Sequence, residues 1–204
     1  MLNKICSGIS AGIMVSIGGC VFLACESKVV GAVLFSVALL VICYKGFSLF
    51  TGKVGYIPEK HGREEVSVLL LGLLGNLIGT LLCGVLIRTA LPNLGSAALA
   101  ACGAKLTQTA YSTFVRGLFC GILMYSAVSI YRANSSIAGI VFCIPVFILA
   151  GFEHSIADMF YFAASGTVSA KAFGFIWLVI LGNSAGGMLL PALALAGRKE
   201  KIYG

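Results

Sequence analysis

The stretch AGFEHSIADMF, from Ala150 to Phe160, lies inside a long apolar segment that begins near Ile137. Within six residues it places a glutamate, a histidine and an aspartate, which are Glu153, His154 and Asp158. Ionisable side chains are costly inside a bilayer, and those that occur there are functional by default. The stretch therefore predicts a membrane helix that is interrupted at a candidate functional site.

The composition of the whole chain indicates that lipid is its solvent. Of the 204 residues, 59% are hydrophobic and 10% are charged, and the mean hydropathy is +1.04. A soluble domain carries about 25% charged residues, so this chain lacks the polar groups to cover its surface. We expect one membrane domain over residues 1–204, with a retained first helix rather than a signal peptide. The net charge of +7 comes from basic residues between apolar segments, which fits lipid headgroups rather than nucleic acid.

Six apolar segments reach the length of about 20 residues that a bilayer core demands of a helix. They cover approximately residues 5–25, 29–50, 66–88, 112–131, 137–165 and 173–196. The second and the fifth contain glycine and polar residues, so we expect both helices to be interrupted. The connector over residues 89–111 is expected to hold a short helix, and the polar segment over residues 56–65 is predicted to be a loop.

Lysine and arginine counts predict the orientation of these helices. With both termini in the cytoplasm, eight basic residues lie inside and five lie outside. The inside set is Lys4, Lys53, Lys60, Arg63, Arg132, Arg198, Lys199 and Lys201, and the outside set is Lys28, Arg88, Lys105, Arg116 and Lys171. We therefore expect a multi-pass protein of the cell inner (plasma) membrane with both termini cytoplasmic.

Three pairs of short motifs recur in the same order, 105 to 109 residues apart. The pairs are SGISAG (7–12) with RGLFCG (116–121), KGFSLFTGK (45–53) with AGFEHSIAD (150–158), and GNLIG (75–79) with GNSAG (182–186). Each copy holds three spans, an odd number, so the second copy enters the membrane with opposite polarity. We predict an inverted repeat, with repeat 1 near residues 1–90, repeat 2 near residues 110–198, and interrupted helices 2 and 5 facing a solute path.

The polar residues of the two breaks suggest a path for an anion. Freed N–H groups and a hydroxyl at a helix break can coordinate an anion, and Thr51 fits this role in the first break. His154 is the only histidine in an apolar span, and we expect it to act at the second break. If the helix resumes there, His154 and Asp158 share a face, and Glu153 is expected to point towards freed backbone N–H groups.

Asn76 and Asn183 occupy matching places in the two repeats. An asparagine amide both donates and accepts, so each is expected to bridge the broken backbone of a neighbouring helix. A pore-lining role for Asn183 is compatible with that bridge. The small residues around both asparagines allow the helices to approach closely.

Nothing in the sequence indicates an enzyme, a cofactor or a metal site. The chain has eight cysteines but no CxxC motif and only two histidines, so neither a disulfide framework nor a zinc site is supported. An intramembrane enzyme built on His154 and Asp158 would lack a second histidine, serine or cysteine motif, and this set is a poor metal site.

The segments GFSLFTGKV, GFEHSIADMF and LGNSAGG, in this order and spacing, resemble the formate/nitrite transporter family over nearly the whole chain. The resemblance implies a homopentamer of aquaporin-like six-helix protomers, each with its own pore for small monovalent anions of weak acids, such as formate, nitrite or hydrosulfide. It also implies apolar gates at Leu39 and Leu49 on one side and at Phe147 on the other. By the same resemblance the pore residues are Thr51 in the second-helix loop, the central His154, its neighbour Glu153, and Asn183 on the sixth helix.

Two departures from the family pattern concern the substrate. Ser48 stands where the family often has an acid, and Lys45 stands where it usually has an apolar or small residue. Lys45 and Lys53 beside the break are expected to favour a small anion such as hydrosulfide, with Lys45 as a pore residue. The alternative function is an aquaporin-like channel for small neutral solutes, which the inverted repeat fits equally well. Neither break contains the Asn-Pro-Ala signature of such channels.

Overall fold

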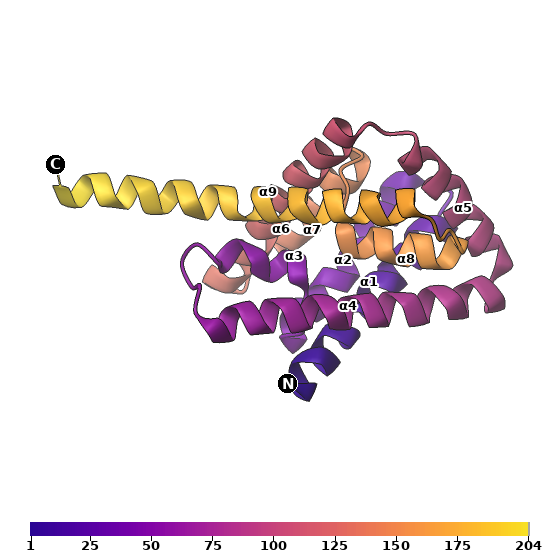
Figure 1. The fold of residues 1–204 in the computed structure, drawn as a ribbon, viewed down its shortest axis with the longest axis horizontal. Coiled ribbons are helices and arrows are strands. Elements are labelled where there is room, and N and C mark those ends of the chain that lie inside the picture. The colour runs from indigo at the N-terminus through magenta and orange to yellow at the C-terminus, as the bar shows by residue number, and fades with distance from the viewer. Residues whose placement is uncertain (204) are drawn as a thin grey trace.

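A computed structural model describes the backbone of residues 1–203 and the side chains of residues 1–197. All regular secondary structure in that part of the chain is helical, and Figure 1 shows the helices gathered into one bundle beyond which α9 extends. The elements are α1 (Leu2–Ala24), α2 (Lys28–Lys45), α3 (Phe50–Lys53), η1 (Val54–Tyr56), α4 (Arg63–Ala90), α5 (Pro92–Leu106), α6 (Ala110–Asn134), α7 (Ala138–Leu149), α8 (Ser155–Ser165) and α9 (Ala170–Tyr203). The inside set of basic residues includes Arg198, Lys199 and Lys201, which lie outside the described side chains.

The six predicted spans are confirmed. The helices α1, α2, α4, α6 and α9 have the length and hydropathy to cross a membrane. The fifth predicted span, over residues 137–165, is divided between the shorter apolar helix α7 and the helix α8 that follows it. The interruptions fall where they were expected, between α2 and α3 and between α7 and α8.

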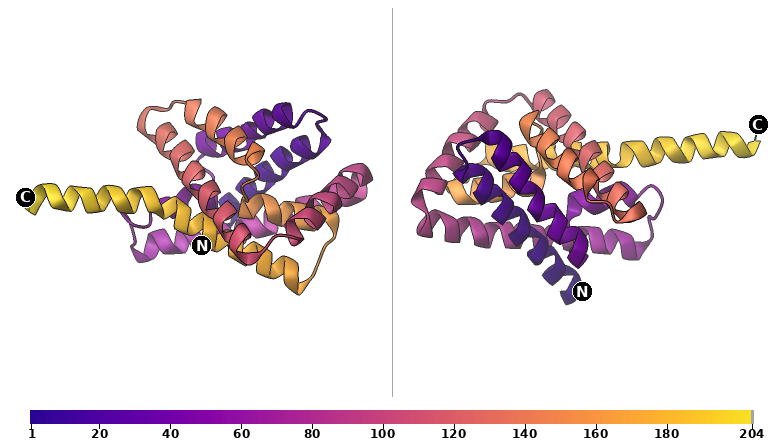
Figure 2. Two further views of the ribbon diagram at one scale, coloured as in Figure 1. Left: turned by 90° about the horizontal axis from the view of Figure 1, so that it is seen from above. Right: turned by 180° about the vertical axis from the view of Figure 1, so that it is seen from behind.

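The two repeats pack in the same manner. In the first, α1 lies against α2 and α4; in the second, α6 lies against α7 and α9. Figure 2 shows α1 and α2 side by side at the N-terminal end of the ribbon. A Cβ atom on Gly75 would collide with the Ile5 carbonyl, and one on Gly182 would collide with the Phe114 carbonyl. Small residues therefore allow the first and last helix of each repeat to approach backbone to backbone.

The segments between the spans differ in part from the sequence-based expectation. The connector holds α5, a 15-residue helix with Pro92 in its first turn, where a missing N–H costs no hydrogen bond. The predicted loop over residues 56–65 is shorter than expected. The 3-10 helix η1 runs to Tyr56, and α4 already begins at Arg63, with Glu64 and Glu65 in its first turn. Acidic side chains favour a helix N-terminus, so the charged end of the segment is helical rather than loop.

The outer surface of the bundle is apolar along its length. Large side chains such as Leu82, Phe142 and Trp177 are exposed on it. The interior is more polar than this surface, because Thr51, Asn76, His154, Asp158 and Asn183 are all buried. A protein with apolar groups outside and polar groups inside fits a lipid environment with a polar path through its centre.

Candidate functional site

Two helix breaks with matching backbone conformations form the centre of the molecule. Gly46 ends α2 with a φ of 69°, and Gly151 follows α7 with a φ of 71°. After each glycine, the next N–H returns to the preceding helix: Phe47 donates to Ile42 at 3.0 Å, and Phe152 donates to Phe147 at 2.9 Å. This is the glycine C-cap that closes many helices. The chain then runs on without helical structure and starts α3 at Phe50 and α8 at Ser155.

A buried asparagine holds each break in place. Asn76 accepts a hydrogen bond from the Phe50 N–H at 2.9 Å and donates to the carbonyls of Gly8 and Ser48, both at 2.8 Å. The expectation that its amide bridges a broken backbone is therefore confirmed. Two backbone groups that the break frees, the Phe50 N–H and the Ser48 carbonyl, are satisfied by one side chain, as a bilayer interior requires.

Asn183 makes the equivalent set of contacts in the second repeat. It accepts from the Ser155 N–H at 2.9 Å and donates to the carbonyls of Gly117 and Glu153, both at 2.8 Å. The bridging role expected for this asparagine is likewise confirmed. The amide oxygen and the amide NH₂ group of Asn183 both bind backbone groups. Asn183 therefore stabilises the break, and these atoms are not free to bind a solute.

The two breaks meet at a hydrogen bond between Thr51 and His154. Thr51 Oγ1 lies 2.8 Å from His154 Nε2, and both side chains are buried. His154 also caps α8, because its Nδ1 accepts a hydrogen bond from the Ala157 N–H at 3.1 Å. A nitrogen that accepts carries no hydrogen, so in the neutral ring the hydrogen sits on Nε2 and faces Thr51.

Three cavities lie in series across this meeting point. The cavity lined by Ala101 and Lys105 of α5, here called the α5-side cavity, has a volume of about 450 Å³. The cavity lined by Gly52 and Lys53 of α3, here called the α3-side cavity, has a volume of about 130 Å³. Between them lies a central pocket of about 10 Å³, which has room for about one water. His154 lines both the central pocket and the α5-side cavity.

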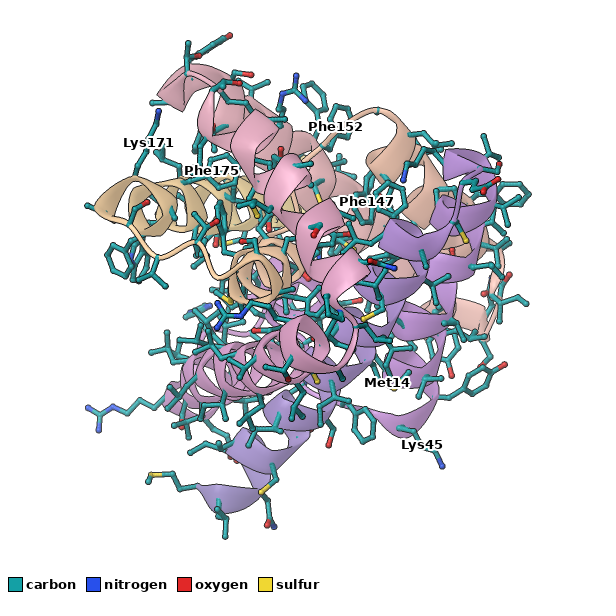
Figure 3. The ribbon with its side chains drawn as sticks, turned by 90° about the vertical axis from the view of Figure 1, so that its right-hand side faces the viewer. Met14, Lys45, Phe147, Phe152, Lys171 and Phe175 are labelled. Atoms are coloured by element: carbon teal, nitrogen blue, oxygen red, sulfur yellow. The ribbon has the colours of Figure 1, made fainter. Side chains whose placement is uncertain are left out.

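Apolar side chains separate the three cavities. Leu39 and Leu49 line both the central pocket and the α3-side cavity, whereas Phe147 lines both the central pocket and the α5-side cavity. The Phe147 ring stacks on His154 with its centroid 5.8 Å from the imidazole centroid and meets Phe35 edge-on. Figure 3 shows Phe147 among the side chains in the interior. The three residues expected to form gates thus stand at the two ends of the central pocket.

Two cationic side chains stand in the lining of the α3-side cavity. Lys53 and Arg132 line it, and no carboxylate does so among the residues whose side chains the structure describes. Lys53 Nζ donates to Ser48 Oγ at 2.9 Å. Lys45, which was expected in the pore, is exposed at the end of α2 and lines neither cavity in the described part of the chain. Figure 3 shows its side chain at the periphery, because the left-handed Gly46 turns the chain inward only after Lys45.

The α5-side cavity contains charges of both signs. Lys105 forms ion pairs with Glu153 and with Asp158, the second at 2.9 Å, and Gln108 Nε2 donates to Glu153 Oε1 at 2.7 Å. The expectation that Glu153 points to freed backbone N–H groups is therefore wrong. Asn183 already satisfies that backbone, so the carboxylate turns instead to a cation from α5.

Sequence reasoning missed the contributions of α5 and α6 to this cavity. Lys105 and Arg116 were counted only for orientation, and Gln108 was not singled out. Arg116 Nη1 donates to the Gly151 carbonyl at 2.7 Å and so holds the second break from the cavity side. No sequence motif indicates these contacts, because Lys105 and Glu153 lie 48 residues apart on different elements. Within the described residues, no group of three or more His, Cys, Asp or Glu side chains is placed to hold a metal ion.

Comparison with known proteins gives consistent matches. The family model described as Formate/nitrite transporter matches residues 1–197. The chain is similar to the Uncharacterized transporter YwcJ of Bacillus subtilis (strain 168), with 32% identity over 148 residues that cover 66% of this chain and 58% of the relative. It is also similar to the Nitrite transporter NirC of Escherichia coli (strain K12), with 28% identity over 181 residues that cover 78% of this chain and 67% of the relative.

Two solved structures share the fold. One is titled FNT family ion channel, with a TM-score of 0.78 and 23% identity, covering 97% of this chain and 88% of that chain. The other is titled Pentameric formate channel with formate bound, with a TM-score of 0.74 and 25% identity, covering 99% of this chain and 97% of that chain. These matched proteins are transporters and channels rather than enzymes.

Proposed function

The chain belongs to the formate/nitrite transporter family, and from that premise we propose that it passes small monovalent anions of weak acids across the membrane. It is an integral membrane channel and not an enzyme. Formate, nitrite and hydrosulfide are the candidate substrates. The observation that carries the proposal is the hydrogen bond between Thr51 and His154, which joins the two helix breaks at the pocket between the apolar residues.

The first step of the mechanism is to gather anions at the mouths. Lys53 and Arg132 at the α3-side cavity attract an anion. Leu39 and Leu49 then exclude water from the entrance to the central pocket. A bare ion pays several kcal/mol, on the order of its residual desolvation cost in proteins, to enter such a place.

His154 and Thr51 offset that cost inside the pocket. The Nε2–H of His154 and the hydroxyl hydrogen of Thr51 can both be donated to one anion, and hydrogen bonds to a charged acceptor are the strong ones. The same low dielectric raises the pKa of a weak acid and favours its neutral form. Because Nδ1 is engaged by the Ala157 N–H, His154 serves better as a neutral donor than as a store of a second proton. A proton that neutralises the anion then comes from water in one of the larger cavities.

The orientation and assembly are part of the same proposal. We propose that both termini are cytoplasmic, which makes the α3-side cavity the inner mouth and the α5-side cavity the outer mouth. The excess of basic residues on that side supports this orientation. We also propose a homopentamer in the inner (plasma) membrane, supported by the fold shared with a pentameric formate channel.

Flux into liposomes tests the proposed function. Formate, nitrite and hydrosulfide uptake would be measured across pH for the purified protein, for His154→Ala and for Thr51→Ala. Removal of a hydrogen-bond donor that faces a developing or buried charge costs about 100-fold in rate, so we expect a loss of that order in each variant.

Matched controls come from the exposed residues His61 and Thr89, whose alanine variants should keep the parent flux. Unchanged flux and pH dependence in both His154→Ala and Thr51→Ala would overturn the mechanism. Water or glycerol uptake without anion uptake would instead favour the aquaporin-like alternative.

A further inference from the structure

Lys105 lies between two buried carboxylates that it cannot fully neutralise. Its Nζ forms an ion pair with Glu153 and lies 2.9 Å from Asp158 Oδ1. The same ammonium group stands over the Tyr161 ring at 5.7 Å from the centroid. One positive charge for two carboxylates leaves an excess negative charge in a place where charge is costly. All three members of this triad, Lys105, Glu153 and Asp158, line the α5-side cavity.

The two carboxylates are not equally satisfied. Glu153 receives a hydrogen bond on each oxygen, from Lys105 on Oε2 and from Gln108 on Oε1. Asp158 is 1% exposed, and its Oδ2 finds no hydrogen-bond partner among the residues that the structure describes. Donors to a carboxylate favour its ionised form, so the carboxylate with fewer donors is the one that takes a proton.

We propose that Asp158 is a proton-binding site of the α5-side cavity, and that it carries a proton on Oδ2 at neutral pH. Binding converts the carboxylate to a neutral carboxylic acid; the proton comes from water in the cavity and returns to it. With Asp158 protonated, the triad is neutral overall. With Asp158 ionised, the triad has a net charge of −1 beside the entrance to His154. Resting on the proposed function, we infer that this charge sets how readily an anion crosses the α5-side cavity.

The groups that face the triad leave Asp158 as the member that changes charge. Burial by itself lowers the pKa of Lys105, but the Asp158 and Glu153 carboxylates outweigh it and raise that pKa above its ordinary value, so the ammonium remains charged. Arg116 of α6 also lines this cavity. Four other titratable groups lie near the triad: Cys102 on α5, Cys120 on α6, Tyr161 on α8, and His154 immediately before α8. Two more lie further out: Cys20 on α1 is beside Tyr161, and Cys83 on α4 is beside Cys20. The residue of α9 next to Glu153 is Asn183, whose amide side chain has no titratable group.

Infrared spectroscopy of the purified full chain tests the proton directly. A protonated carboxyl group has a C=O stretching band that an ionised carboxylate lacks. Ordinary aspartate and glutamate are ionised above about pH 6, so a band that persists there and disappears towards about pH 9 reports a buried acid. We expect this band in the parent, its loss in Asp158→Asn, and its retention in Glu26→Gln, which removes an exposed acid between α1 and α2.

Transport supplies the second measurement. Substrate protonation affects the parent and the variant alike, so the ratio of formate flux in Asp158→Asn to that in the parent cancels it. The ratio should be close to one near pH 6 and should rise roughly tenfold towards pH 9, as expected for one unit charge acting across a partly hydrated cavity. Glu26→Gln should keep a ratio close to one throughout.

The outcomes separate this inference from the proposed function. Absence of a titrating carboxyl band in the parent, or its survival in Asp158→Asn, would overturn the assignment. A constant flux ratio across pH would overturn the inferred effect on the anion. A band that titrates and is lost in Asp158→Asn, in a protein that passes none of formate, nitrite and hydrosulfide, would support the proton site and contradict the proposed function. Because asparagine is isosteric with aspartate and Lys105 keeps Glu153 as partner, the variant should fold, and the parent spectrum needs no variant at all.

Discussion

In both helix breaks, a left-handed glycine ends one helix and an asparagine from the last long helix of the same repeat secures the next. The side chains placed on this common backbone differ. Leu49 of the first break corresponds to His154 of the second, and both residues are extended. In the same register Ser48 corresponds to Glu153, and Lys53 corresponds to an acid, Asp158.

The comparison separates the features that the membrane requires of any helix break from the charges, which concern the solute. Freed backbone groups must be satisfied in either half, so the glycine and the asparagine recur. The membrane does not require the charged side chains to recur, and those of the two breaks have opposite signs. Lys53 of the first break lines the α3-side cavity. Glu153 and Asp158 of the second break line the α5-side cavity, together with Lys105 of α5. Of the two breaks, only the second contains a histidine, and the hydrogen bond between His154 and Thr51 joins it to the first.

The largest effect is expected from removing the asparagines. Asn76→Ala and Asn183→Ala each remove three buried hydrogen bonds and leave an N–H and a carbonyl of the break unsatisfied, so each should lower the stability by about 3 kcal/mol. Heating of the detergent-solubilised protein followed by size-exclusion chromatography measures the folded fraction. Asn93→Ala, at an exposed position on α5, is the control. Tolerance of one buried substitution but not the other would show that the two breaks are not held alike.

A smaller and unequal effect is expected at the two glycines. Alanine in the left-handed region costs roughly 1 to 2 kcal/mol, so Gly46→Ala should lower the stability by about that amount. Its Cβ would meet nothing within 4 Å. Gly151→Ala should cost more, because its Cβ would lie 2.9 Å from Arg116 Nη1 and disturb the bond to the Gly151 carbonyl. Equal thermal shifts in the two variants would contradict this ranking.

The apolar residues at the two ends of the central pocket should act in series. Because the remaining constriction still excludes water, Leu49→Ala and Phe147→Ala singly should raise the water permeability of liposomes by about twofold, and the double variant by about tenfold. Stopped-flow light scattering measures this permeability, with chromatography to confirm that each variant folds. If one single substitution raised the water permeability as much as the double substitution, only that residue would act as a gate.

The smallest effect is expected from the charge at the first break. Lys53→Gln should lower formate flux by about two- to threefold at low ionic strength and by less at high salt, since attraction over a distance is screened. Lys60→Gln removes an exposed lysine of the neighbouring loop and is the control. An equal loss in both variants at each salt concentration would mean that net charge, rather than the position of Lys53, is responsible.

The sequence was sufficient for the features that repeat or that depend on local pattern. Apolar runs predict the six spans, and the recurrence of GNLIG and GNSAG predicts that Asn76 and Asn183 have one common role. Contacts between side chains that lie far apart in the sequence could not be predicted in this way. The pairing of Glu153 with Lys105 depends on how α5 folds back, and the outward direction of Lys45 depends on the turn at Gly46. Neither is encoded by spacing or periodicity.

An experimentally determined structure of the assembled protein with formate is the most direct test of the central claim, which is that the solute passes between the two breaks. The account predicts the anion in the central pocket, with its oxygens at hydrogen-bond distance, about 2.7 to 3.2 Å, from His154 Nε2 and Thr51 Oγ1. Formate found only between subunits or on a symmetry axis, with the bond between Thr51 and His154 unchanged, would contradict it.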